Sequence, residues 1–97
     1  MRDDDLVADW LVERIAAILK VDAGSISYEA AFADLGLSSV QAVELSGELE
    51  QWAGLRLPPT LAYDCPTIDS AAEFVAGEAR REGRPLPGRQ GAEGAPR

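Results

Sequence analysis

Ser39 is the side chain in this sequence that is best placed to carry a chemical group. Residues 38–41 read Ser-Ser-Val-Gln, a pattern typical of a helix start in which Ser38 caps the first turn and Gln41 closes it. Ser39 is then not needed for capping and can face outward. Because a helix N-terminus offers free N–H groups and the positive end of the helix dipole, a phosphate attached there would be stabilised. Two serines before a helix are most often only a helix start, and the residues alone favour that simpler interpretation.

Other groups that could do chemistry are scarce. The sequence has no histidine and a single cysteine, Cys65. Without histidine no Ser-His-Asp or Cys-His arrangement can form, and one cysteine supplies neither an internal disulfide nor a zinc site of the usual kind. The glycine patterns of phosphate-binding and dinucleotide-binding loops are absent. We therefore expect a non-catalytic chain with no metal site, in which Cys65 is a small buried hydrophobe.

The charge balance narrows the choice of partners. The chain has 17 acidic against 9 basic residues, a net charge of −8, and an acidic body repels nucleic acid and anionic membranes while attracting basic patches on proteins. The longest apolar run, residues 15–19, is too short to span a bilayer, and the N-terminus does not read as a signal peptide. A lone cysteine is consistent with a reducing compartment. We expect a cytoplasmic monomer that binds neither nucleic acid nor membranes.

Apolar spacing predicts a first helix close to the N-terminus. The three aspartates at 3–5 suit a helix cap and first turn, and the helix continues to about Lys20 before Gly24 helps to end it. Its buried stripe has i, i+4, i+7, i+8 spacing and consists of Leu11, Ile15, Ile18 and Leu19. Residues 21–37 show no sustained period, so we expect a long loop pinned to the core, and such loops are often functional.

Two further long helices and a short one are predicted downstream. One runs from Ser38 to about Ala53, where Gly54 supplies the stop. Two prolines then exclude helix, and a short helical turn follows at 61–64. Thr67 caps the last helix, which extends to about residue 82.

These elements define the fold class and the domain. We expect an all-α fold: a small four-helix bundle of three main helices plus one short helix, with a long loop between helices I and II. Residues 1–82 form the domain, and residues 83–97, rich in Gly, Pro and Arg, form a disordered tail. Because the helices are short, packing rather than helix propensity must stabilise the bundle.

Two segments resemble the acyl carrier protein family. Residues 31–45, AFADLGLSSVQAVEL, look like its phosphopantetheine attachment region and are closest to carriers of modular polyketide synthases. Residues 57–68, LPPTLAYDCPTI, resemble the family's segment leading into the last helix. The register, with Leu-Gly before and Val-Glu-Leu after, places the attachment on Ser39. Ser38 stands where the family usually has Asp, and Val40 where it usually has Leu; Ser38 can still cap the helix.

The resemblance implies a role and a set of partners. A carrier of this kind presents thioester-linked acyl intermediates of polyketide biosynthesis on a phosphopantetheine arm, here at Ser39, after modification by a phosphopantetheinyl transferase. Other implied partners are an acyl-loading enzyme (an adenylate-forming ligase or an acyltransferase) and ketosynthase-type enzymes, met through an acidic helix II. The partner-facing positions carried over are Val40, Glu44, Gly47 and Glu48.

Alternatives remain open at this point. The first alternative is a peptidyl carrier of nonribosomal synthesis, whose sequence resembles Leu-Gly-Gly where this chain has Leu-Gly-Leu at 35–37. The second is a primary fatty-acid carrier, which usually has an acidic residue in place of Gln41. An unmodified helical adaptor would need Ser39 to be dispensable. Tyr63 either lines a groove beside the arm or packs in the core, and Trp10 and Trp52 are expected at the core or its edge. Met1 and the tail favour a free-standing carrier over one excised from a larger synthase.

Overall fold

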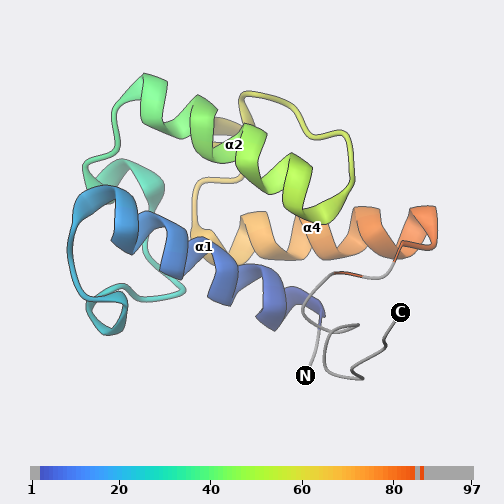
Figure 1. The fold of residues 1–97 in the computed structure, drawn as a ribbon, viewed down its shortest axis with the longest axis horizontal. Coiled ribbons are helices and arrows are strands. Elements are labelled where there is room, and N and C mark those ends of the chain that lie inside the picture. The colour runs from blue at the N-terminus through green and yellow to red at the C-terminus, as the bar shows by residue number, and fades with distance from the viewer. Residues whose placement is uncertain (1–2, 85, 87–97) are drawn as a thin grey trace.

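The chain folds as a helical bundle (Figure 1), which the computed structural model describes for residues 3–84 and residue 86. In chain order the elements are α1 (Asp3–Leu19), the 3-10 turns η1 (Ala23–Ser25) and η2 (Phe32–Leu35), α2 (Ser39–Ala53), α3 (Leu61–Asp64) and α4 (Ile68–Glu82). The predicted all-α fold with three main helices and one short helix is confirmed. Among these described elements, no helix combines the length and the apolar character needed to cross a bilayer.

The core lies between α1, α2 and α4. α1 packs chiefly along α4, and α2 lies above both (Figure 1). The largest fully buried side chains come from all three helices and from the C-terminal end: Val7, Leu11, Ile15, Leu49, Ile68, Val75 and Leu86. α4 meets this core mainly through small residues that are at most 1% exposed, namely Ala71, Ala72, Ala76 and Ala79. Small side chains at the contact allow α1 and α4 to approach closely, as helix packing requires.

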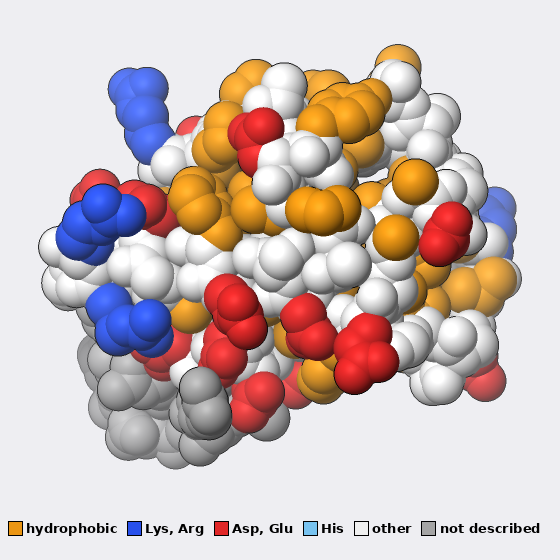
Figure 2. Space-filling view, turned by 180° about the vertical axis from the view of Figure 1, so that it is seen from behind, with side chains coloured by type: hydrophobic (Ala, Val, Ile, Leu, Met, Phe, Trp, Pro, Cys, Tyr) orange, Lys and Arg blue, Asp and Glu red, His pale blue; other side chains and the backbone are white. Residues whose placement is uncertain are grey.

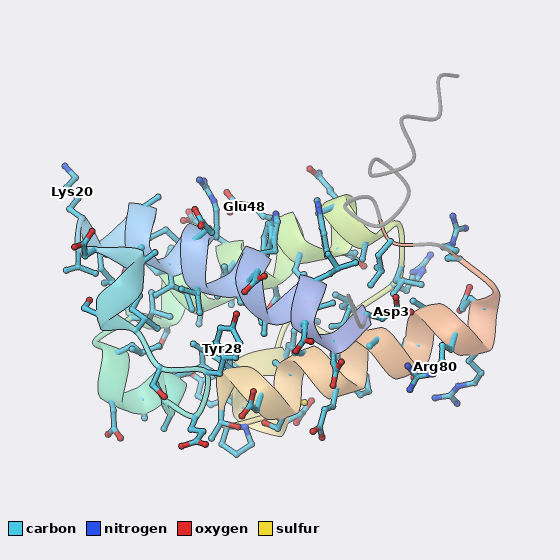
Figure 3. The ribbon with its side chains drawn as sticks, turned by 90° about the horizontal axis from the view of Figure 1, so that it is seen from below. Asp3, Lys20, Tyr28, Glu48 and Arg80 are labelled. Atoms are coloured by element: carbon cyan, nitrogen blue, oxygen red, sulfur yellow. The ribbon has the colours of Figure 1, made fainter. Side chains whose placement is uncertain are left out.

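The end of α1 differs from the expectation. The helix ends at Leu19 and Lys20 adopts the left-handed conformation, with φ of 60°. Gly24 lies within η1 and is not the terminator, so that prediction is wrong. Lys20 remains at the exposed end of α1 opposite Asp3 (Figure 3). A left-handed residue is what commonly stops a helix, and here it is lysine rather than the usual glycine.

The long segment between α1 and α2 is held against the start of α4. Phe32 N–H donates to the Pro66 carbonyl at 2.8 Å, and Ile68 N–H donates to the Ala30 carbonyl at 3.1 Å. Asp69 N–H donates to the Tyr28 carbonyl at 2.9 Å. The Phe32 side chain is itself buried in the core. The predicted pinned loop is therefore present, with two 3-10 turns, and its attachment fixes the approach to α2.

Leu86 lies in the core, although it falls within the segment predicted to be a tail. Leu86, which sequence analysis placed in the disordered tail, is 0% exposed and belongs to the core cluster. We therefore propose that the folded domain extends beyond residue 82 to include Leu86. Residues 85 and 87–97 of the predicted tail lie outside the described residues.

Candidate functional site

The start of α2 is shaped by a turn and a capping box. Gly36 has φ of 85°, a left-handed conformation that favours glycine, and it redirects the chain after η2. Ser38 Oγ accepts from Gln41 N–H at 3.1 Å, and Gln41 Oε1 accepts from Ser38 N–H at 2.9 Å. The predicted capping box is confirmed. It occupies two of the backbone donors at this helix end and leaves those of Ser39 and Val40 directed out of the helix.

Ser39 is the first residue of α2, and its side chain is exposed. Its Oγ takes no part in the capping box. It lies 3.4 Å from the phenolic oxygen of Tyr63 on α3, within reach of a weak hydrogen bond. The chain thus presents an exposed serine hydroxyl that takes no part in capping. It lies at a helix N-terminus, where the helix dipole favours an attached anion.

A shallow pocket of about 110 Å³ adjoins Ser39. The segment before α2, α2 itself and α3 all contribute to the pocket wall. The wall is formed by Phe32, Ala33, Leu37, Ser38, Ser39, Ala42, Ala62 and Tyr63. The Tyr63 side chain is 66% exposed. Of the two placements considered for Tyr63, the structure therefore favours the groove beside Ser39 over the core.

The four positions expected to face partners differ in exposure. Val40 is 65% exposed, and Glu44 and Gly47 are exposed as well. Glu48 is only partly buried, but its carboxylate is engaged: Arg14 of α1 donates to it from Nε at 2.6 Å and from Nη2 at 3.0 Å. The pair lies at the surface beside α1, where Figure 3 labels Glu48. No spacing in the sequence relates Arg14 to α2, so its contact with Glu48 was not predicted.

The ion pair changes the electrostatics of this surface. The hydrogen bonds from Arg14, together with its positive charge, lower the pKa of Glu48 although partial burial opposes them. The same contact raises the pKa of Arg14. Another α2 carboxylate, Glu50, accepts from Leu57 N–H at 3.0 Å. Two apolar side chains near Ser39 on α2 are exposed: Val40 is its neighbour in the chain, and Val43, one helical turn after Ser39, is 47% exposed. Sequence analysis did not single out Val43.

The remaining singled-out residues have structural roles. Cys65 is buried, and this burial, with the neighbouring Asp64 charge, raises the pKa of its thiol. A raised pKa leaves little thiolate at neutral pH, so Cys65 is poorly suited to accept an acyl group. Trp10 and Trp52 stack with ring centroids 5.5 Å apart at the edge of the core, as expected. Within residues 3–84 and 86, no cluster of side chains could hold a metal ion.

The structure therefore combines a small helical bundle with an exposed serine, Ser39, at the N-terminus of its second long helix. Comparison with known proteins agrees: the family of the phosphopantetheine attachment site matches residues 9–75. The chain belongs to this family, whose members carry a covalently attached phosphopantetheine group.

Polyketide synthases are among the relatives of this chain. The chain is 40% identical over 74 residues, 76% of its length, to the phenolphthiocerol synthesis polyketide synthase Pks15/1 of Mycobacterium marinum. It is 41% identical over 64 residues, 61% of its length, to 6-methylsalicylic acid synthase of Aspergillus terreus. In both cases the matched region is only 4% of the relative, so the chain corresponds to one small domain of these large proteins.

Solved carrier structures share the fold. A free-standing peptidyl carrier protein from Acinetobacter baumannii superposes with a TM-score of 0.75 at 32% identity, covering 80% of this chain and 98% of that one. The HMG-ACPI domain of the CurA module from Lyngbya majuscula superposes with a TM-score of 0.72 at 28% identity, covering 79% and 78%. The chain is therefore a carrier domain with polyketide synthase relatives.

Proposed function

We propose that phosphopantetheine is attached to Ser39 Oγ and that the chain presents acyl groups of polyketide biosynthesis on it. The observation that carries this proposal is the exposed Ser39 hydroxyl at the first position of α2, spared from capping because Ser38 performs that task. The residues fit the group: the hydroxyl is accessible, the helix end favours its phosphate, and a shallow pocket lies alongside. When attached, phosphopantetheine supplies the thiol on which an acyl group is held.

Attachment is a single nucleophilic substitution at one phosphorus of coenzyme A. Ser39 Oγ forms a bond to the phosphorus that bears the pantetheine portion of coenzyme A, and the bond from that phosphorus to 3′,5′-ADP breaks. The serine proton passes to a base of the phosphopantetheinyl transferase. The chain contributes the nucleophilic oxygen and its orientation, and the transferase contributes the catalysis.

We further propose that the partners are synthase enzymes. An acyl-loading enzyme, either an adenylate-forming ligase or an acyltransferase, and ketosynthase-type enzymes would meet the carrier over α2, at Val40, Glu44, Gly47 and Glu48. Because Glu48 is paired with Arg14, Glu44 is the better candidate for charge contact with a basic partner. Coenzyme A and a free Cys65 thiol both suit a cytoplasmic location.

A peptidyl carrier is the second candidate function. The fold of the Acinetobacter baumannii peptidyl carrier protein favours it, with 32% identity over most of both chains. The polyketide synthase relatives, at 40% and 41% identity, favour the polyketide assignment. Loading assays with acyl and aminoacyl donors separate the two, since each carrier is loaded by enzymes of its own pathway.

The direct test is mass spectrometry after modification in vitro. The purified protein is mixed with coenzyme A, Mg²⁺ and a broad-specificity phosphopantetheinyl transferase, beside a Ser39→Ala variant. We expect one phosphopantetheine adduct, localised to Ser39 by fragmentation and absent from the variant. An adduct on Ser38 would keep the carrier function but overturn the register. No adduct with several transferases would leave an unmodified helical adaptor as the better description.

A further inference from the structure

We propose that Tyr63 and the adjoining pocket hold the first part of the chain's own phosphopantetheine arm. In this proposal the Tyr63 hydroxyl donates to the phosphate on Ser39, and the apolar pocket wall receives the two geminal methyl groups that follow that phosphate in pantetheine. The inference rests on the proposed attachment at Ser39. It assigns a positioning role to Tyr63 and a ligand to the pocket, whereas the terminal thiol and its cargo stay outside.

The first support is the contact between Ser39 and Tyr63. Their oxygens are 3.4 Å apart, longer than the roughly 2.7–2.8 Å of an ordinary hydroxyl pair. Within the described residues this is the single hydrogen-bonding contact of the Tyr63 hydroxyl. Esterification removes the proton of Ser39 Oγ, so the phenol must then donate. Phosphate oxygens are anionic acceptors, and a bond from a hydroxyl to such an acceptor is shorter and stronger than one between two neutral groups.

The second support is the position of Tyr63 on a short, braced element. α3 spans only four residues, and Cys65 N–H donates back to the Leu61 carbonyl at 2.8 Å. The side chain of Leu61 is buried, which fixes α3 to the core. Tyr63 is 66% exposed although most of its surface is an apolar ring. A large ring kept at the surface beside an attachment serine is explained if it lies against a ligand for much of the time.

The third support is the size and lining of the pocket. Beyond the two serines and the phenol, its wall is apolar: Phe32, Ala33, Leu37, Ala42 and Ala62. Its volume of about 110 Å³ is somewhat below the roughly 150 Å³ of an apolar cavity that holds one benzene molecule. That space suits a quaternary carbon with two methyl groups. It is far too small for an extended acyl chain, so we infer that the cargo remains accessible to partner enzymes.

The surface around the pocket agrees with an apolar ligand. Figure 2 shows hydrophobic side chains gathered over the upper half of the molecule, where α2 lies in Figure 1, and acidic side chains mainly over the lower half. The pocket itself offers the Tyr63 hydroxyl as a donor and apolar side chains as contacts.

The test combines two NMR measurements on the modified protein. Isotope-labelled protein is modified with unlabelled coenzyme A, and filtered NOEs are recorded from the geminal methyl protons of the arm. The 31P shift of the phosphodiester is measured in parallel. The variants are Tyr63→Phe, which keeps the ring and removes the hydroxyl, and Tyr28→Phe as a matched control. Tyr28 is the other exposed tyrosine of the described chain, and its phenol donates to Asp9 instead.

We expect NOEs from the arm methyl groups to the Tyr63 ring, Leu37 and Ala62. In Tyr63→Phe the 31P shift should move and these NOEs should weaken by roughly twofold or more, as the loss of one hydrogen bond predicts; Tyr28→Phe should match the wild type. A modified wild-type protein without such NOEs would overturn the proposal, as would a Tyr63→Phe variant unchanged in both measurements. An intact mass without an adduct would instead overturn the attachment at Ser39, and this inference with it.

Discussion

Arg14 of α1 holds Glu48 of α2 in a two-point contact, with N–O distances of 2.6 and 3.0 Å. The pair adds a polar contact between two helices that a long loop separates in the sequence. It also leaves less free negative charge on α2 than the sequence implies. Glu50 is also engaged, through Leu57 N–H, so Glu44 is the α2 carboxylate that stands exposed without such a contact in the described residues. Docking to α2 is then expected to depend on apolar contact at Val40 as much as on charge.

The Arg14–Glu48 pair predicts a pH dependence. Because Arg14 lowers the pKa of Glu48 below its ordinary value of 4.5, the folded state prefers the ionised carboxylate. The resulting stabilisation is fully present above the unfolded pKa and is lost as pH falls through the lowered, folded pKa. Glu48→Gln should therefore lower Tm at pH 7, by less than about 4 °C since the pair is exposed, and should approach the wild type in strong acid.

Thermal melts by circular dichroism between pH 7 and pH 3 check this expectation. Glu44→Gln is the matched control, because Glu44 lies on the same helix without an ion-pair partner in the described structure. A Tm difference between Glu48→Gln and wild type that does not shrink in acid would contradict the pairing.

The two adjacent serines predict opposite phenotypes. Ser38→Ala removes the acceptor of the capping box and should cost about 1 kcal/mol of unfolding free energy, while phosphopantetheine is still attached. Ser39→Ala should change stability by less than about 0.5 kcal/mol and abolish attachment. Urea unfolding and intact mass measure the two effects on the same samples. The reverse pattern would mean that the capping and attachment roles are exchanged.

Local signals predicted most of this fold. The Ser38 capping box and the stop at Gly54, which has φ of 69°, both follow from residue types within one or two helical turns. The carrier resemblance points to Ser39 because two separate segments match the family, whereas the serine pair alone is ambiguous. The attachment at Ser39 is thus a proposal drawn from the sequence, and capping by Ser38 explains why the Ser39 hydroxyl is available for it.

Contacts between distant segments were not predictable in the same way. Arg14 and Glu48 are 34 residues apart, and no periodicity links them. The Tyr63 hydroxyl meets Ser39 only because α3 folds back beside α2. Leu86 appeared to belong to a tail because Gly and Pro dominate its surroundings, and composition cannot show whether one leucine fills a core gap. Such features depend on tertiary packing, which overrides local composition.

Lys20 predicts a stabilising substitution. With φ of 60°, it occupies a left-handed position in which a side chain is strained and glycine is not. Lys20→Gly should raise the unfolding free energy by about 0.5–1 kcal/mol, whereas Lys20→Ala should leave it nearly unchanged. Urea unfolding of the wild type and both variants measures these differences in unfolding free energy. A glycine variant less stable than the wild type would show that the lysine side chain itself stabilises the fold.

Leu86 predicts where the folded domain ends. Its side chain is 0% exposed in the cluster that also contains Val7 and Leu49, so Leu86→Ala should cost about 2–5 kcal/mol. Glu82→Ala, an exposed change four residues earlier, should stay within about 0.5 kcal/mol of wild type. A chain shortened to end at residue 84 should be destabilised like Leu86→Ala, because it loses the same buried contacts. Urea unfolding that shows neither effect would return the boundary to residue 82 and place Leu86 outside the stable core.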